Sequence, residues 1–181
     1  MKVLAIVPAK LDSKRLKHKN IREVGGKPMF LHSVDYARQS SYDVDVIVSS
    51  ESSIVEQICK QHNILFHTRS KELCGDVEVV DVYEAIINEL GKEYDIVVGL
   101  QPDNPNRVNS LDSCIKYMID NKYDDIITID ETYRRSGAMR LFKYNLLKEG
   151  KVSYRIGSIK ETATDIHTEE DLKQLNKDYS E

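Results

Sequence analysis

The sequence predicts an α/β fold in which helices flank a mainly parallel sheet. Short apolar runs, most of them followed closely by a proline or a pair of serines, alternate with segments whose apolar residues recur at helical spacing. This alternation favours βαβ units with right-handed crossovers. The 181 residues match the length of one domain, and no repeat, low-complexity segment or linker divides them. We therefore expect one domain over residues 1–181.

The expected strands are short and rich in Val, Ile and Leu, and the first, second and fourth are almost uninterrupted apolar runs. Such runs are typical of strands buried on both faces of a parallel sheet. In chain order, the strands are expected at residues 3–7, 44–48, 64–67, 96–100, 126–130 and 138–142.

The expected helices lie between these strands and carry an apolar stripe. In the third of them, Val79, Val82 and Ile86 fall on one helical face. Thr168 stands directly before the last helix, where it can act as the N-cap. In chain order, the helices are expected at residues 27–39, 52–62, 79–90, 110–120, 143–149 and 169–176.

Composition argues against several classes of protein. The longest apolar run, residues 3–7, is far shorter than the about 20 residues that a membrane span needs, so we expect no membrane partner. No apolar leader precedes this run, which predicts a cytoplasmic protein. The three cysteines, Cys59, Cys74 and Cys114, lack the spacing of a zinc site or a disulfide framework. The net charge of −4 argues against a general nucleic-acid binder.

The charge is unevenly distributed along the chain. Residues 10–27 hold seven lysines or arginines against two acidic residues and carry +5, so the remainder carries −9. This basic segment directly follows the first strand, at the edge of an open α/β sheet where ligands bind. Backbone amides and basic side chains there can hold a polyphosphate, and the alternative is a solvated lysine-rich loop. Neither a GxxxxGK[ST] nor a GxGxxG motif is present.

Several sequence blocks resemble one family in the same order along the chain. The segment PAKLDSKRLKHKN at residues 8–20, followed by GKP at 26–28, resembles the signature of the cytidylyltransferases that activate acidic sugars, the CMP-acylneuraminate synthetases and their relatives. Further blocks similar to family motifs are VIVSS at 46–50, RSKEL at 69–73, LQPDNPNR at 100–107, RSGA at 135–138 and TDIHTEEDL at 164–172.

The resemblance implies a Rossmann-like nucleotidyltransferase of the GT-A-like type, with a mixed, mainly parallel sheet that binds CTP. A hydroxyl of the acidic sugar attacks the α-phosphate and pyrophosphate leaves, with Mg²⁺ as the cofactor and Mn²⁺ as its alternative. The basic residues implied to clamp the triphosphate during catalysis are Lys10, Lys14, Arg15 and Lys19. The residues implied to bind the nucleotide are Pro8, Ala9, Lys10, Ser13, Lys19, Asn20 and Arg69.

The acceptor is assigned three residues. Gln101 matches a family position that contacts the sugar, and Arg107 and Arg135 are candidates for holding the negative charge of the acceptor. A planar guanidinium group matches a carboxylate or a phosphate, and the alternative for each arginine is an ordinary surface position.

The resemblance also has departures. Lys10 replaces a family arginine, which exchanges a bidentate group for a point charge. The paired aspartates near the family's C-terminus read Asp165-Ile166-His167 here. Imidazole suits Mn²⁺ or Zn²⁺ better than Mg²⁺, which keeps several waters. Either Asp165 alone holds a partly hydrated Mg²⁺, or a further residue supplies a ligand, and the candidate metal ligands are Asp165, His167 and Asp103. The alternative for His167 is a histidine bonded to the backbone. A family serine pair is replaced around residues 78–80, so selectivity for cytosine is inferred from the other blocks.

The largest departure is a missing insertion. The family carries an arm between the strand at residues 126–130 and the RxxGA-like block, and here that block follows almost at once. The arm forms the family's dimer and borders the sugar site. We therefore expect a monomer, or a dimer of a different kind, and a small anionic acceptor that is either an acidic sugar or a smaller acid, phosphate or phosphonate.

Two readings from other classes remain open. The change at His167 and the missing arm are compatible with a non-catalytic nucleotide-binding regulator. An RNA-binding module is disfavoured, because the basic segment lacks interleaved aromatic residues and the rest of the chain is acidic. No nucleic-acid partner is therefore expected.

Overall fold

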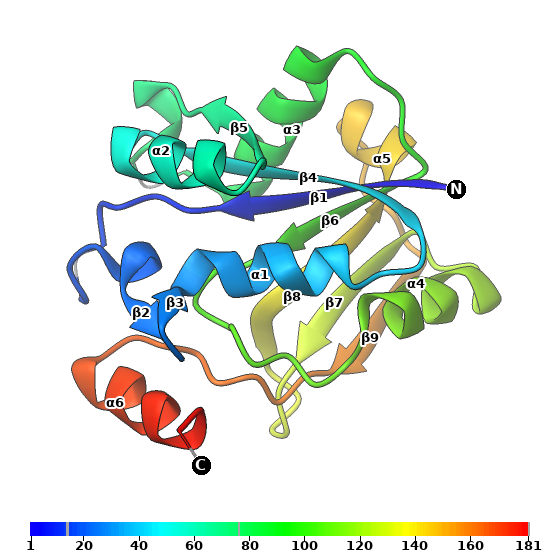
Figure 1. The fold of residues 1–181 in the computed structure, drawn as a ribbon. Coiled ribbons are helices and arrows are strands. Elements are labelled where there is room, and N and C mark those ends of the chain that lie inside the picture. Colours follow the sequence, from blue (N-terminus) through cyan, green and yellow to red (C-terminus); the bar gives the residue numbers. More distant parts are fainter. Residues whose placement is uncertain (14, 76, 181) are drawn as a thin grey trace.

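The structure, a computed structural model, describes residues 1–13, 15–75 and 77–180, and is built on one mixed sheet. Its seven strands have the order β5-β4-β1-β6-β8-β7-β9 (Figure 1). All neighbours pair in parallel except β8, which is antiparallel to both β6 and β7. The strands are β1 (Lys2–Pro8), β4 (Asp43–Ser50), β5 (Leu65–Thr68), β6 (Ile96–Leu100), β7 (Asp125–Ile129), β8 (Arg135–Lys143) and β9 (Ile156–Lys160). The predicted fold class is confirmed.

Helices cover both faces of the sheet, and the alternation of β1 shows why two cores form. Val3, Ala5 and Val7 pack into one core with α1, α2 and α4, whereas Leu4 and Ile6 pack into the other with α3 and α5. Figure 1 shows α1 and α4 in front of the strands. The helices are α1 (Met29–Arg38), α2 (Ser53–Gln61), α3 (Val79–Leu90), α4 (Leu111–Asp120), α5 (Tyr144–Lys148) and α6 (Glu169–Asp178). None of them, within the described residues, is both long and apolar enough to cross a bilayer.

A smaller unit holds the last helix near the start of the chain. The strands β2 (Glu23–Val24) and β3 (Lys27–Pro28) form a hairpin, and α6 packs beside it (Figure 1). Residues 27–28 therefore belong to a strand, not to the first helix as expected. Thr168 is confirmed as the N-cap of α6, because its side chain accepts from Asp171 N and the Asp171 side chain bonds back to the cap.

The strand β9, which lies beside β7 as an outer strand of the sheet, was not predicted from the sequence. Its residues read IGSIK, with one buried position, so it lacks the apolar run that marks the central strands. Gly157 is the buried residue, and a Cβ there would lie 2.5 Å from Tyr123 Cδ2. The strand exists because this close approach and its pairing with β7 fix it in place.

The connection from β7 to β8 is a tight turn of residues 130–134. The Asp130 carboxylate accepts hydrogen bonds from Thr132 N (2.8 Å), Thr132 Oγ1 (2.7 Å) and Arg134 N (3.0 Å). A turn closed by its own first side chain leaves no inserted arm at this position.

Gly99→Ala is expected to destabilise the fold by about 1–3 kcal/mol, because overpacking forces neighbouring groups to shift. The new Cβ would lie 2.1 Å from the hydroxyl of Tyr83, which is buried under the sheet. Urea unfolding monitored by circular dichroism measures the change. Gly75→Ala is the control, because no atom of the described residues beyond its chain neighbours lies within 4 Å of its added Cβ. Equal unfolding free energies for the two variants would contradict the prediction.

Candidate active site

The loops after β1, β4 and β6 meet at the carboxyl ends of these strands. Ala9 N donates to Ser49 O (2.8 Å), which ties the end of β1 to the end of β4. The basic loop, residues 10–22, lies within the basic segment and follows β1. The Asn20 side chain donates to Lys10 O (2.7 Å) and holds the two ends of this loop together. Pro8 and Ala9 are buried where this loop starts, so they shape it. The open edge that the sequence predicted as the ligand site is thus formed by the expected segments.

A cavity of about 340 Å³ lies under the basic loop. Cationic and hydrogen-bonding groups surround it, in agreement with a site for an anion. Its polar lining includes Lys10, Ser13, Arg15, Lys19, Cys74 and His167, and Asp12 adds a carboxylate to the same lining. Four of these were expected to bind or clamp the nucleotide, and Cys74 was missed because a single cysteine carries no spacing signal. Lys14, also expected there, lies outside the described residues.

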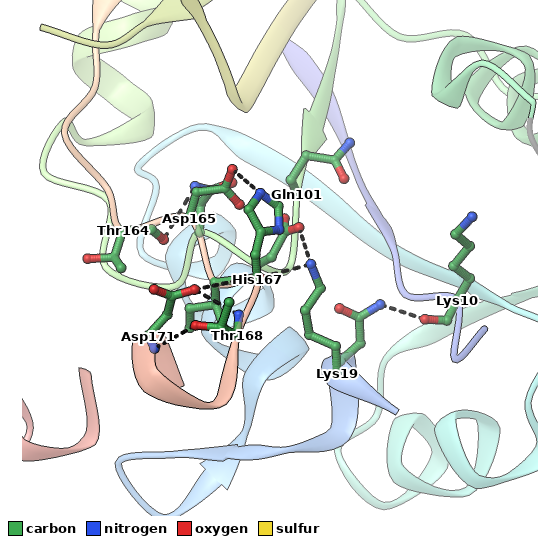
Figure 2. A network of polar contacts seen from close by, with 12 residues as sticks. Lys10, Lys19, Gln101, Thr164, Asp165, His167, Thr168 and Asp171 are labelled. Carbon is green, nitrogen blue, oxygen red and sulfur yellow. Dashed lines mark hydrogen bonds and ion pairs between the residues drawn. The ribbon is translucent and has the colours of Figure 1, made fainter. Parts of the chain in front are cut away.

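The three expected metal ligands converge next to this cavity. Asp103 follows β6, and Asp165 and His167 precede α6, yet one ligand atom of each lies within 4.8 Å of the others. His167 Nε2 is 2.7 Å from Asp165 Oδ2, and Figure 2 shows the two side chains pointing toward each other. Two carboxylates and an imidazole nitrogen form a donor set that fits a divalent cation.

The charges of this cluster are partly balanced from within the chain. Lys19 Nζ lies 2.6 Å from Asp103 Oδ2 and 3.0 Å from Ile166 O. Burial raises the pKa of Asp165, as does the nearby charge of Asp103, while His167 and Lys19 act in the opposite direction. Among the residues that the structure describes, His167 Nδ1 is buried without a hydrogen-bond partner, so the alternative of a backbone-bonded histidine finds no support at that atom.

Arg69 has a different position from the one expected. It is buried and donates to Ser49 O (3.1 Å) and Ser49 Oγ (3.4 Å), and burial lowers its pKa. The same hydroxyl lies 2.9 Å from His67 Nδ1, and His67 Nε2 lies 3.1 Å from Glu89 Oε2. Arg69 therefore anchors the end of β4. Its guanidinium group is engaged with Ser49, so contact with a nucleotide stays a prediction.

Two of the three expected acceptor residues share a second cavity, of about 260 Å³. Gln101 and Arg135 both line it, and Gln101 Nε2 lies 3.4 Å from the hydroxyl of Tyr83. Glu78 and Tyr83 also line this cavity. They were not predicted from the sequence, because only the fold brings the start of α3 to the end of β6.

Arg107, the third expected acceptor residue, points into the protein. Its guanidinium donates to Gln101 O (2.6 Å), Ala138 O (2.8 Å) and Ser33 Oγ (3.1 Å), and it lies over the ring of Tyr36. Burial lowers its pKa to about 10. This geometry corrects the expected acceptor role, because a guanidinium bound to two carbonyls joins the loop after β6 to β8.

Comparison with known proteins agrees with this geometry. The profile described as cytidylyltransferase matches residues 4–176. The chain belongs to the cytidylyltransferase family. Among the curated relatives of this chain, the CMP-N,N'-diacetyllegionaminic acid synthase of Legionella pneumophila is 35% identical over 114 residues, which are 59% of this chain and 48% of that protein. The N-acylneuraminate cytidylyltransferase of Streptococcus agalactiae is 28% identical over 141 residues, 76% of this chain and 34% of that protein.

These curated relatives are longer than this chain, which spans about half or less of their length. Among solved structures, a CMP:2-keto-3-deoxy-manno-octonic acid synthetase complexed with CTP aligns with a TM-score of 0.79 at 15% identity, over 99% of each chain. A cytidylyltransferase from Leptospira borgpetersenii aligns with a TM-score of 0.75 at 18% identity, over 97% of this chain and 85% of that one. At these identities the structural likeness shows a shared fold.

Acidification is expected to destabilise this protein through His67. Burial lowers the pKa of His67, and nearby Arg69 also lowers it, against a raising effect of Glu89. The folded protein therefore takes up a proton less readily than the unfolded chain, so stability falls as the pH drops below about 6.5. Urea unfolding at pH 7.0 and 5.5 measures this loss. His67→Gln should show a smaller loss than the wild type, and His62→Gln, at an exposed position, should not. Equal losses in all three proteins would exclude His67 as the cause.

Proposed function

We propose that this protein transfers CMP from CTP to an acidic sugar of the nonulosonic type, or to another small anionic acceptor, and releases pyrophosphate. The observation that carries the proposal is the placement of the basic cavity beside the cluster of Asp103, Asp165 and His167, at the strand edge where α/β sheets bind ligands. The names of the curated relatives support CTP as the nucleotide and an acidic sugar as the acceptor.

The basic cavity would hold the triphosphate. In the reaction, an acceptor hydroxyl oxygen bonds to the α-phosphorus of CTP and releases its proton to solvent. The bond between the α-phosphorus and the bridging oxygen breaks, and pyrophosphate leaves with that electron pair. Such transfers depend on positioning and on neutralising charge at the phosphate oxygens. Lys10, Arg15 and Lys19 line the cavity and would supply positive charge, and Ser13 would supply a hydroxyl group.

The metal would be held by Asp103, Asp165 and His167. A divalent cation bound there would neutralise charge on the phosphate oxygens. We propose Mg²⁺ as the cation, which the two carboxylates favour, and Mn²⁺ as its alternative, which the imidazole favours.

The acceptor would bind in the second cavity. Gln101 and Arg135 line it, and a guanidinium group can pair with a carboxylate or a phosphate. The turn at residues 130–134 places no arm beside this cavity, which keeps a smaller acid, phosphate or phosphonate as the second candidate acceptor. By the same argument, we propose a monomer or a dimer that does not exchange arms.

The activity is tested by incubating the protein with CTP, Mg²⁺ or Mn²⁺ and a panel of acidic sugars, phosphates and phosphonates, with pyrophosphate as the readout. Turnover with an acidic sugar is the expected result. The absence of turnover with every acceptor, together with no CTP binding by calorimetry, would refute the proposal. CTP binding without turnover, in the wild type and in His167→Asp, would favour the non-catalytic regulator. Tighter binding of GTP or UTP than of CTP would refute the choice of base.

Lys10→Ala is expected to weaken CTP binding about tenfold, because it removes a charge-assisted contact to phosphate. Lys10→Arg is expected to tighten binding, since a guanidinium can bind phosphate through two parallel hydrogen bonds. Isothermal titration calorimetry measures both changes. Lys17→Ala is the matched control, because Lys17 is an exposed lysine of the same loop and does not line the cavity. An equal loss of affinity in Lys17→Ala and Lys10→Ala would mean that the net charge of the loop, and not a direct contact of Lys10, determines CTP binding.

Arg135→Ala is expected to raise the KM for the acceptor at least about tenfold, because it removes the partner of the acceptor anion. The KM for CTP is expected to stay unchanged, since Arg135 lines the second cavity and not the basic one. Steady-state kinetics of pyrophosphate release distinguish the two constants. Arg134→Ala, at the neighbouring exposed position, serves as the control. A rise in the KM for CTP alone would place Arg135 at the nucleotide.

A further inference from the structure

Lys19 connects the basic cavity to the metal cluster. It lies in the short 3₁₀ helix Lys19–Ile21 at the end of the basic loop, and it lines the cavity. Its ammonium group nevertheless points away from the loop, to Asp103 Oδ2 at 2.6 Å and Ile166 O at 3.0 Å (Figure 2). The side chains of Lys19 and Asp103 are only 12% and 20% exposed, so water screens this pair weakly.

The contact uses a carboxylate that the metal would need. Asp103 is one of the three residues whose ligand atoms lie within 4.8 Å of one another. A divalent cation bound there would share Asp103 with the Lys19 ammonium group in a half-buried site. Two positive charges that contact the same carboxylate repel each other strongly when water screens them weakly. A cation can therefore take Asp103 only when Lys19 finds another anion.

The triphosphate is that anion. Lys19 lines the cavity in which Lys10 and Arg15 lie, so a phosphate group bound there comes within reach of its flexible side chain. Departure of the ammonium to the phosphate would free Asp103 for the cation. Bound phosphate oxygens would also lie between the two positive charges and lower their repulsion.

We infer that Lys19 is an internal counter-ion that keeps the metal cluster closed to a cation alone and opens it when the nucleotide arrives. This inference rests on the proposed function, because it takes a nucleoside triphosphate as the ligand of the basic cavity. It makes metal and nucleotide binding mutually dependent, since each ligand tightens the other by the same factor. A purely structural ion pair would have no such effect, and its loss would change stability without improving metal binding.

The test titrates the protein with Mn²⁺ in the absence of nucleotide and follows free Mn²⁺ by electron paramagnetic resonance. Lys19→Met is expected to bind Mn²⁺ about tenfold more tightly than the wild type, a typical size for coupling between sites. The same variant is expected to bind CTP more weakly. Lys17→Met, which removes the same charge from an exposed position of the loop, should bind Mn²⁺ as the wild type does. In Lys19→Met/Asp103→Asn the gain in Mn²⁺ affinity should disappear.

Two further measurements keep the outcomes separate. Lys19→Gln retains a donor for the Ile166 carbonyl and replaces Lys19→Met if that variant fails to fold. In the wild type, saturating CTP should tighten Mn²⁺ binding about tenfold, after correction for Mn²⁺ bound to free CTP, and in Lys19→Met by less. Unchanged Mn²⁺ affinity in both Lys19 variants would overturn the counter-ion role while leaving the cytidylyltransferase proposal intact. If the wild type bound no CTP, the proposed function would fail, and tighter Mn²⁺ binding by Lys19→Met would still support the closed cluster.

Discussion

The site depends on one tertiary contact, between the loop after β6 and the segment that leads into α6. Ile166 N donates to Asp103 O (3.0 Å), and Thr164 N donates to the Asn106 side chain (2.8 Å). Glu161 reinforces this contact from inside the protein, because its buried carboxylate accepts from Val108 N (2.9 Å) and Asn109 N (3.3 Å). A buried carboxylate satisfied by backbone donors fixes the loop that carries Asp103 beside the segment that carries Asp165.

The same segment is fixed from its other end by α6. The Asp171 carboxylate accepts from His167 N (2.9 Å) and Thr168 N (2.7 Å), so the start of the helix sets the backbone position of His167. Arg22 binds Glu169 through two hydrogen bonds of 2.7 and 2.8 Å, which connects α6 to the end of the basic loop. The groups proposed to bind phosphate and those proposed to bind the metal therefore belong to one framework, although more than 140 residues separate Arg22 from Glu169.

The arginines of the site divide into two kinds. Arg69 and Arg107 stand within blocks that resemble family motifs, but their guanidinium groups bind carbonyls and hydroxyls of the chain itself. Arg15 and Arg135 line the two cavities and have exposed side chains. The motif blocks thus contain residues that hold the frame of the proposed site as well as residues that line its cavities, and a match to a motif does not by itself separate the two.

The sequence alone determined the central strands, the helices and the chemistry of the loops. Apolar runs and helical periodicity depend on neighbouring residues, so β1, β4 and β6 and the helix α3 could be predicted from local pattern. The basic loop and the three residues of the metal cluster could also be predicted, because charge and the blocks that resemble family motifs can be identified from the sequence alone.

Only the tertiary structure decided how these parts meet. The edge strand β9 lacks an apolar run and depends on its pairing with β7, and the inward direction of Arg107 depends on carbonyls at Gln101 and Ala138. The pairing of Lys19 with Asp103 joins residues 84 positions apart. Such contacts are set by which distant groups the fold brings within a few ångströms and desolvates together, and no local pattern of residues encodes that.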